Sequence, residues 1–232
     1  MRTLFGVTYT VQLFVYIRLF FRKKRHYITH LKELTGAEGE QKFIGSGISF
    51  CAVCDGAFFK DKAVAVIGGG NTAVQDAIYL SKICSKVYLI HRRSEFRAEK
   101  HVADGLAACA NIEPVLNSTV ARFIGEGKLS GIVVKNRETG EERELSVSGA
   151  FIAVGFAPNN GVFAELVKLD ESGFIRSGED CKTSRPEIFA AGDCRTKSVR
   201  QLVTAGADGG VAAIAACEYI DSMQNAEKAA ES

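Results

Sequence analysis

A glycine-rich turn between a strand and a helix is the feature that most constrains how this chain can fold. Residues 63–67 form an apolar run with the length of a buried strand, and three consecutive glycines, Gly68 to Gly70, follow it. The spacing then predicts a helix over 71–83 and a second strand over 86–91. This order indicates a βαβ unit, so we expect a parallel sheet and a fold of the α/β class.

The composition of this turn suits a pyrophosphate. Small residues allow backbone N–H groups to approach the anion, and the positive end of a helix dipole lies beside it. A glycine turn is a weak signal by itself, but here it follows a strand, opens a helix and precedes a second strand. We therefore expect dinucleotide contacts from Gly68, Gly70, Asn71, Thr72 and Ala73.

The end of the second strand is where the ribose of such a dinucleotide is recognised. A carboxylate there would accept the 2′-hydroxyl of NAD, whereas this chain has His91, Arg92 and Arg93, followed by Arg97. Arginines favour a 2′-phosphate, so the sequence predicts NADPH. The alternative is that these arginines form an ordinary solvated face.

A Cys-x-x-Cys pair, Cys51 and Cys54, lies shortly before the first strand. In an α/β protein such a pair usually cycles between dithiol and disulfide. The alternative is half of a zinc site, which needs two more ligands at matching spacing, and the other cysteines and the histidines are scattered. We therefore expect no metal, and electrons that pass from a nicotinamide toward a disulfide.

The cysteine count and the net charge exclude several classes of protein. Seven cysteines, an odd number, argue against an extracellular disulfide framework and favour a reducing cytosol. A net charge of +2 predicts no general affinity for nucleic acid. The 232 residues can form one large domain or two small ones.

Beyond the βαβ unit the pattern changes to short alternating runs. A second helix is expected over 98–110 and a third parallel strand over 112–116. The later strands are expected in an antiparallel meander over 120–125, 130–135 and 142–147, and as buried strands over 150–154 and 188–191. A long helix is expected over 204–222, and the charged tail after Asn225 is expected to fray.

The N-terminal stretch over residues 3–21 is mostly apolar, but Gln12 and Arg18 interrupt it. Charge inside a membrane-spanning segment is costly. A strand or a disordered remnant is therefore favoured over a membrane anchor, and we expect no membrane contact.

Taken in order, these motifs closely resemble those of the low-molecular-weight, bacterial-type thioredoxin reductases. The resemblance covers residues 34–221. Its motifs lie within Cys51–Gly56, Gly68–Ala73, His91–Arg97, Val154–Asn159 and Ala191–Gln201.

The resemblance implies that an NADPH domain is inserted into an FAD domain. Residues 1–33 would form an atypical N-terminal segment, residues 34–155 the Rossmann-like NADPH domain with its meander, and residues 156–232 the C-terminal part of a Rossmann-like FAD domain. The family works as a homodimer that uses NADPH and FAD to reduce thioredoxin, so a thioredoxin or thioredoxin-like protein is the expected partner in the cytoplasm.

The resemblance also implies roles for individual residues. Cys54 would lie against the flavin, Cys51 would exchange with thioredoxin, and Asp55 would protonate the departing thiolate or the flavin-linked intermediate. The alternative for Asp55 is that it only caps the following turn. Further cofactor contacts are implied for Gly155, Gly192, Asp193, Arg200, Gln201 and Leu202.

The sequence departs from the family at its N-terminus. The family's first glycine-rich turn, which seats the FAD pyrophosphate, has no counterpart, because Gly6 is isolated. Two classes of function remain: a thioredoxin-disulfide reductase, whole or truncated and inactive, and an NADPH-binding dithiol fragment without flavin. Flavoproteins that reduce peroxiredoxins, of the alkyl hydroperoxide reductase type, are a further alternative, but they prefer NADH.

Overall fold

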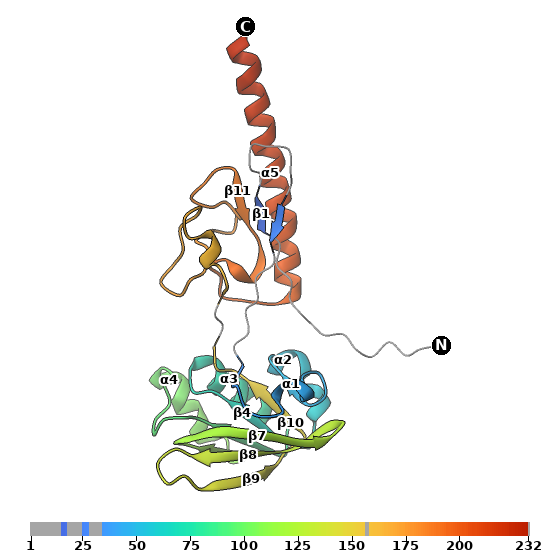
Figure 1. Ribbon diagram of the computed structural model, residues 1–232, viewed down its shortest axis with the longest axis vertical. Coiled ribbons are helices and arrows are strands. Elements are labelled where there is room, and N and C mark those ends of the chain that lie inside the picture. Colours follow the sequence, from blue (N-terminus) through green and yellow to red (C-terminus); the bar gives the residue numbers. More distant parts are fainter. Residues whose placement is uncertain (1–14, 18–24, 28–33, 156–157, 232) are drawn as a thin grey trace, which may run out of the picture. The chain divides into compact units, whose positions relative to one another are not determined.

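The computed structural model describes residues 15–17, 25–27, 34–155 and 158–231. Within it the chain divides into two compact units (Figure 1). The first unit comprises residues 34–155. The second comprises residues 158–231 together with the strands at 15–17 and 25–27.

A five-stranded parallel sheet forms the centre of the first unit. Its order is β3-β10-β4-β5-β6, and every neighbouring pair runs parallel. Its strands are β3 (Ile48–Ser49), β4 (Ala63–Ile67), β5 (Lys86–Ile90), β6 (Ile112–Val115) and β10 (Gly149–Ile152). The helix α3 (Asn71–Ser81) connects β4 to β5. The predicted βαβ unit and parallel strands are confirmed, with small differences at their ends.

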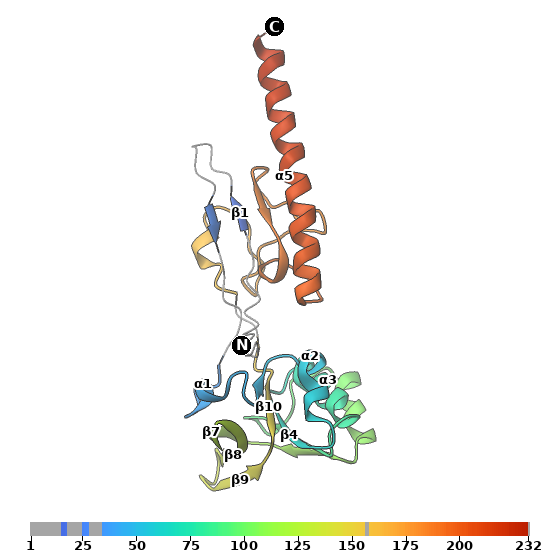
Figure 2. The ribbon, with the colours of Figure 1, turned by 90° about the vertical axis from the view of Figure 1, so that its right-hand side faces the viewer.

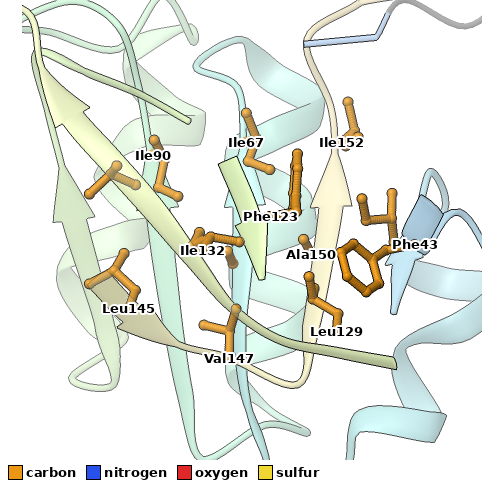
Figure 3. Packing of buried hydrophobic residues seen from close by; sticks show 13 residues of the cluster. Phe43, Ile67, Ile90, Phe123, Leu129, Ile132, Leu145, Val147, Ala150 and Ile152 are labelled. Carbon is orange, nitrogen blue, oxygen red and sulfur yellow. The ribbon is translucent and has the colours of Figure 1, made fainter. Parts of the chain in front are cut away.

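An antiparallel meander covers one face of this sheet. It consists of β7 (Ser118–Glu126), β8 (Lys128–Asn136) and β9 (Glu142–Ser146), as the sequence predicts. Ile132 and Ile67 are buried together on this face (Figure 3), whereas Val66 and Leu80 are buried on the opposite face beside α3. Successive strand residues point to opposite faces. The continuous apolar run of β4 therefore supplies both cores.

The prediction of a single helix over residues 98–110 is wrong. The structure has the short helix α4 (Lys100–Ala103), followed by a 3-10 helix, η2 (Asp104–Ala108). Gly105 lies in η2, and glycine weakens a regular α-helix because of its large backbone entropy. The short elements of the first unit that were not predicted from the sequence include α1 (Glu40–Phe43), α2 (Ala52–Asp55) and the 3-10 helix η1 (Gly56–Phe59).

The second unit has a small antiparallel sheet of order β11-β1-β2. It contains β11 (Ile188–Ala190), β1 (Val15–Ile17) and β2 (Arg25–Tyr27), and the unit also has the 3-10 helices η3 (Gly161–Phe163) and η4 (Gly192–Cys194). The resemblance implies parallel strands here. The pairing of β1 with β2 differs because a short connection allows only antiparallel neighbours, while parallel ones need a crossover of about a dozen residues or more. The expectation for the N-terminal stretch was a strand or a disordered remnant, and residues 15–17 form a strand, while the rest of that stretch lies outside the described residues.

The helix α5 (Leu202–Glu231) ends the second unit as one long helix (Figure 2). It continues through the tail that was expected to fray, so that expectation is wrong. The tail after Asn225 is rich in alanine, glutamate and lysine, which are good helix formers. No helix within the described residues is long and apolar enough to cross a membrane.

Candidate functional site

The cysteine pair lies between β3 and α2 in the first unit. Cys51 and Cys54 are joined by a disulfide, with their Cα atoms 5.3 Å apart. Cys51 is the residue before the first turn of α2, and its Sγ accepts a hydrogen bond from the Cys54 N–H at 3.1 Å. Cys51 is half-buried and Cys54 is exposed. The pair therefore lies at the surface of the first unit rather than in its core.

A serine that the sequence analysis did not single out connects this pair to Asp55. Ser49, at the end of β3, donates from Oγ to Asp55 Oδ2 at 2.6 Å and accepts from the Cys51 N–H at 3.1 Å. Ser49 is buried, whereas Asp55 is half-buried. Asp55 makes no capping hydrogen bond to η1, so the alternative of a simple turn cap is wrong. Its carboxylate is instead held beside the disulfide.

The glycine turn between β4 and α3 fits closely against its surroundings. A Cβ at Gly69 would lie 2.1 Å from His91 Nδ1, and one at Gly68, where φ is +150°, would lie 2.3 Å from the Ala153 carbonyl oxygen. A Cβ at Gly70 would meet nothing within 4 Å. The N-terminus of α3 carries no side-chain cap. The turn is thus closed toward the protein and open at Gly70, as the approach of a pyrophosphate requires.

The His91 side chain packs against this turn at Gly69. The side chain is buried, and its ring lies 5.7 Å from the ring of Phe96. Burial lowers the pKa of His91, and the positive charges of Arg92, Arg93 and Arg97 lower it further, against a hydrogen bond with the Glu95 backbone that raises it. The imidazole is therefore shifted toward its neutral form. It contacts Gly69 rather than lying open to solvent.

The loop after β5 is fastened to the glycine turn. The Arg97 N–H donates to the Gly69 carbonyl oxygen at 2.6 Å. Asn71 exchanges two hydrogen bonds with Glu99: its Nδ2 donates to Glu99 Oε1 at 2.9 Å, and its Oδ1 accepts from the Glu99 N–H at 2.7 Å. The exposed side chains of Arg92, Arg93 and Arg97 are thus carried by a loop tied to the helix start. Thr72 is exposed in the first turn of α3, and Ala73 is buried.

The residues implied for flavin binding lie in the second unit, except Gly155, which ends the first. Asp193 is buried in η4, directly after Gly192, which has a φ of +77°. The Arg200 guanidinium lies 4.1 Å from the centre of the Phe174 ring, and its Nε donates to the Asp193 carbonyl oxygen at 3.5 Å. Gln201 precedes α5 and its N–H donates to Thr204 Oγ1, while Leu202 is exposed. The structure therefore brings Asp193, Arg200 and the start of α5 together.

A buried ionic cluster fixes the backbone around η4, and sequence patterns gave no sign of it. Asp208 on α5 accepts from Arg195 Nε at 2.7 Å, from Lys197 Nζ at 2.8 Å and from the Gly192 N–H at 2.6 Å. Arg195 is 1% exposed. Burial alone would raise the pKa of Asp208, but these hydrogen bonds lower it to about 2. The carboxylate is therefore charged, and it joins α5 to the loop that carries Asp193.

Comparison with known proteins places this arrangement in a family. A family model described as pyridine nucleotide-disulphide oxidoreductase matches residues 31–209. The chain belongs to this family. Thioredoxin reductase of Treponema pallidum is 43% identical over 190 residues, which are 82% of this chain and 62% of that protein. Thioredoxin reductase of Listeria innocua is 41% identical over 195 residues, which are 84% of this chain and 61% of that protein.

Solved structures of family members agree with this assignment. Thioredoxin reductase from Streptococcus pyogenes has a TM-score of 0.79 at 34% identity, covering 91% of this chain and 74% of that one. Thioredoxin reductase from Giardia duodenalis has a TM-score of 0.76 at 34% identity, covering 83% and 63%. The chain spans about three fifths of the length of the curated relatives it matches.

The described residues fit the two cofactors to different degrees. In the first unit, the cradle closed by His91 and open at Gly70 has the form that a nicotinamide dinucleotide needs. In the second unit, the described residues include Asp193 and Arg200, but no glycine-rich turn between a strand and a helix. The described residues of the first unit therefore fit a pyridine nucleotide. Those of the second unit fit only part of a flavin cofactor, because they offer no turn for its pyrophosphate.

Proposed function

We propose that this chain carries the NADPH-binding and dithiol-bearing part of a thioredoxin-disulfide reductase. The observation that carries the proposal is a single compact unit that holds both a Cys51–Cys54 disulfide and a nucleotide cradle. Two relatives that are 43% and 41% identical over the aligned 190 and 195 residues are named thioredoxin reductases. In such a reductase NADPH supplies a hydride, FAD passes its two electrons on to the disulfide, and thioredoxin is reduced.

Recognition of NADPH would rest on two parts of the first unit. The open side of Gly70 and the N–H groups of the first turn of α3 would hold the pyrophosphate. The exposed guanidinium groups of Arg92, Arg93 and Arg97 would hold the 2′-phosphate by charge-assisted hydrogen bonds. An acidic residue at this point would favour NADH, so the arginines disfavour the peroxiredoxin-reducing alternative.

Thiol exchange would follow from reduction of the pair to two thiols. One thiolate attacks a thioredoxin disulfide and forms a mixed disulfide, and the other then attacks that bond and releases reduced thioredoxin. Two electrons leave the pair, which returns to its disulfide. Asp55, held by Ser49, is placed to give a proton to the departing thiolate. We assign thioredoxin exchange to Cys51 and the flavin side to Cys54, and mixed-disulfide trapping with Cys51→Ser and Cys54→Ser distinguishes the two orders.

The second candidate is an NADPH-binding dithiol protein without flavin. It is favoured by the described part of the second unit, which offers Asp193 and Arg200 but no second glycine-rich turn. FAD affinity in the family draws on backbone hydrogen bonds to charged pyrophosphate oxygens, each worth about 1.5–3 kcal/mol. The loss of three such bonds weakens binding by several powers of ten.

A visible absorption spectrum of the purified chain separates the two candidates. The flavin-free candidate predicts a colourless protein that binds NADPH and reduces little thioredoxin. A stoichiometric flavin band together with NADPH-dependent thioredoxin reduction would establish the reductase and overturn the fragment. Sedimentation in the same preparation tests the homodimer, and fractionation of cells tests the cytoplasmic location, both of which we propose from the family resemblance.

A further inference from the structure

The arginines of the first unit fall into two groups. Residues 34–155 contain six arginines. Arg122 pairs with Glu142 and Arg143 pairs with Glu113 in the meander. The other four form no ion pair with any carboxylate among the described residues; they are Arg92, Arg93, Arg97 and Arg137. Three of these belong to the loop after β5, and Arg137 comes from the turn between β8 and β9.

Arg137 lies against that loop although it is 45 residues away from Arg92 in the sequence. Its Nη1 donates to the Arg92 carbonyl oxygen at 3.2 Å. Its backbone N–H donates to the Asn117 carbonyl oxygen at 2.7 Å, and the Asn117 N–H donates to the Arg93 carbonyl oxygen at 3.0 Å. A continuous chain of hydrogen bonds therefore fixes Arg137 beside the residues that follow β5.

The turn that carries Arg137 is itself well defined. Asn136 Oδ1 accepts from the N–H groups of Glu138 and Thr139, at 2.9 and 3.1 Å. This Asx-type turn fixes the direction of the backbone on either side of Arg137. The side chain of Arg137 is exposed, and its bond to Arg92 uses one edge of the guanidinium fork. The remaining N–H groups are available for an anion, since Arg presents five donors in a planar arrangement.

Positive charge without carboxylate partners gathers around the loop after β5. The pKa of His91 is lowered by burial, and the charges of Arg92, Arg93 and Arg97 contribute to the shift. Like charges without carboxylate partners repel one another when they lie on neighbouring segments, so an anion that binds between them is stabilised by each. The meander arginines gain no such advantage, because Glu142 and Glu113 neutralise them.

We propose that Arg137 is a fourth cation of the 2′-phosphate site and a determinant of NADPH over NADH. This inference rests on the proposed function, because it requires that the first unit binds NADPH. It adds a residue from the meander to a site otherwise built from the loop after β5. The predicted ligand group is a phosphate monoester on the 2′ carbon of an adenosine.

The test measures binding to the full chain by calorimetry with NADPH, NADH and adenosine 2′,5′-bisphosphate. Arg137→Gln should weaken NADPH and the bisphosphate about tenfold, the size of one charge-assisted contact to a phosphate, and should leave NADH within about twofold. Arg137→Lys should recover part of the loss. Arg122→Gln removes an arginine that is already paired and should change none of the three affinities. The Arg137 effect should shrink as ionic strength rises.

Each result has a defined meaning. A loss for NADPH and the bisphosphate alone supports the inference. Equal losses for NADPH and NADH, or no loss for either, overturn the role of Arg137 while the proposed function stands. If the folded wild-type chain binds neither nucleotide, both the NADPH site and the role of Arg137 are overturned.

Discussion

The two units bury their secondary structure in different ways. In the first, both faces of a parallel sheet are covered, one by the meander and one by α3, with Ile132 and Leu80 fully buried. In the second, the sheet consists of three short antiparallel strands, and α5 leaves large apolar side chains such as Val203 and Ile214 exposed, at 77% and 65%. The second unit has two smaller apolar clusters and adds to them a buried ionic cluster around Asp208.

This difference separates what each unit can do alone. Both the dithiol and the nucleotide cradle belong to the well-covered first unit, so we expect that unit to bind the nucleotide and to keep the cysteine pair in place without the second. The flavin-side residues belong to a unit with an uncovered apolar helix face, in a chain that spans about three fifths of its curated relatives. Nucleotide binding and thiol chemistry are therefore expected to outlast any loss of flavin binding.

The largest effect should come from the cysteine pair of the first unit. Replacing Cys51 or Cys54 with serine should abolish the redox change, because each variant leaves only one sulfur of the bonded pair. Mass mapping of alkylated peptides, before and after dithiothreitol, measures it. The matched controls are Cys181→Ser and Cys194→Ser, buried thiols of the second unit that should leave the mapped disulfide intact. If the pair stays reduced in air while Cys181 or Cys194 changes state, the site is misplaced.

A second large effect should appear in the other unit alone. Asp208→Asn leaves Arg195 without its buried carboxylate partner, and breaking a buried pair typically costs about 3–5 kcal/mol. Hydrogen exchange should show loss of protection in α5 and β11 but not in β4 or α3. The side chain of Glu179, the other partner of Arg195, is 91% exposed. Glu179→Gln should therefore have little effect on protection. Equal loss of protection in both units would show that their stabilities are coupled.

The same cluster predicts a pH dependence for the second unit. The pKa of Asp208 is lowered from 3.8 to about 2 in the folded chain. The stabilisation from this group is therefore fully present above its ordinary pKa and is lost as the pH falls from about 4 toward about 2. In the Asp208→Asn variant this part of the acid sensitivity should be absent. An unchanged acid profile would contradict the charged state of Asp208.

A third effect sharpens the ligand assignment of the first unit. The double variant Arg92→Gln and Arg93→Gln should weaken NADPH about a hundredfold, since each charge-assisted bond to the 2′-phosphate is worth roughly 1.5 kcal/mol. The affinity for NADH should change little. Fluorescence titration with both nucleotides measures the difference. Equal weakening of the two would sink the 2′-phosphate assignment and favour a solvated arginine face.

The smallest effect concerns the support of Asp55. Ser49→Ala removes the donor at 2.6 Å and should destabilise the first unit by about 1 kcal/mol, because water can replace part of the bond at a half-buried carboxylate. The rate at which dithiothreitol reduces the Cys51–Cys54 disulfide should also change in the Ser49→Ala variant. Ser49→Thr keeps the hydroxyl and serves as the matched control. If alanine and threonine behave alike, the hydroxyl does not position Asp55.

Local patterns predicted much of the first unit. The apolar run of β4, the three glycines and the helical spacing of α3 are adjacent in the sequence, and their periodicity reports directly which face of each element is buried. The same patterns failed over 98–110, where an alanine-rich stretch with a central glycine forms two short helices. They also failed after Asn225, where solvated charge was taken for fraying although the residues are good helix formers.

The sequence by itself determined the α/β class, the glycine turn, the cysteine pair and the arginines after the second strand, because each is a contiguous signal. Only the tertiary structure decided that Ser49 holds Asp55, that Arg137 lies beside Arg92 and that Asp208 binds Arg195. The last two contacts join residues 45 and 13 positions apart, and a serine two residues before a cysteine looks like any other. Spacing along a chain records which way a side chain faces, whereas its partner depends on how separate elements pack.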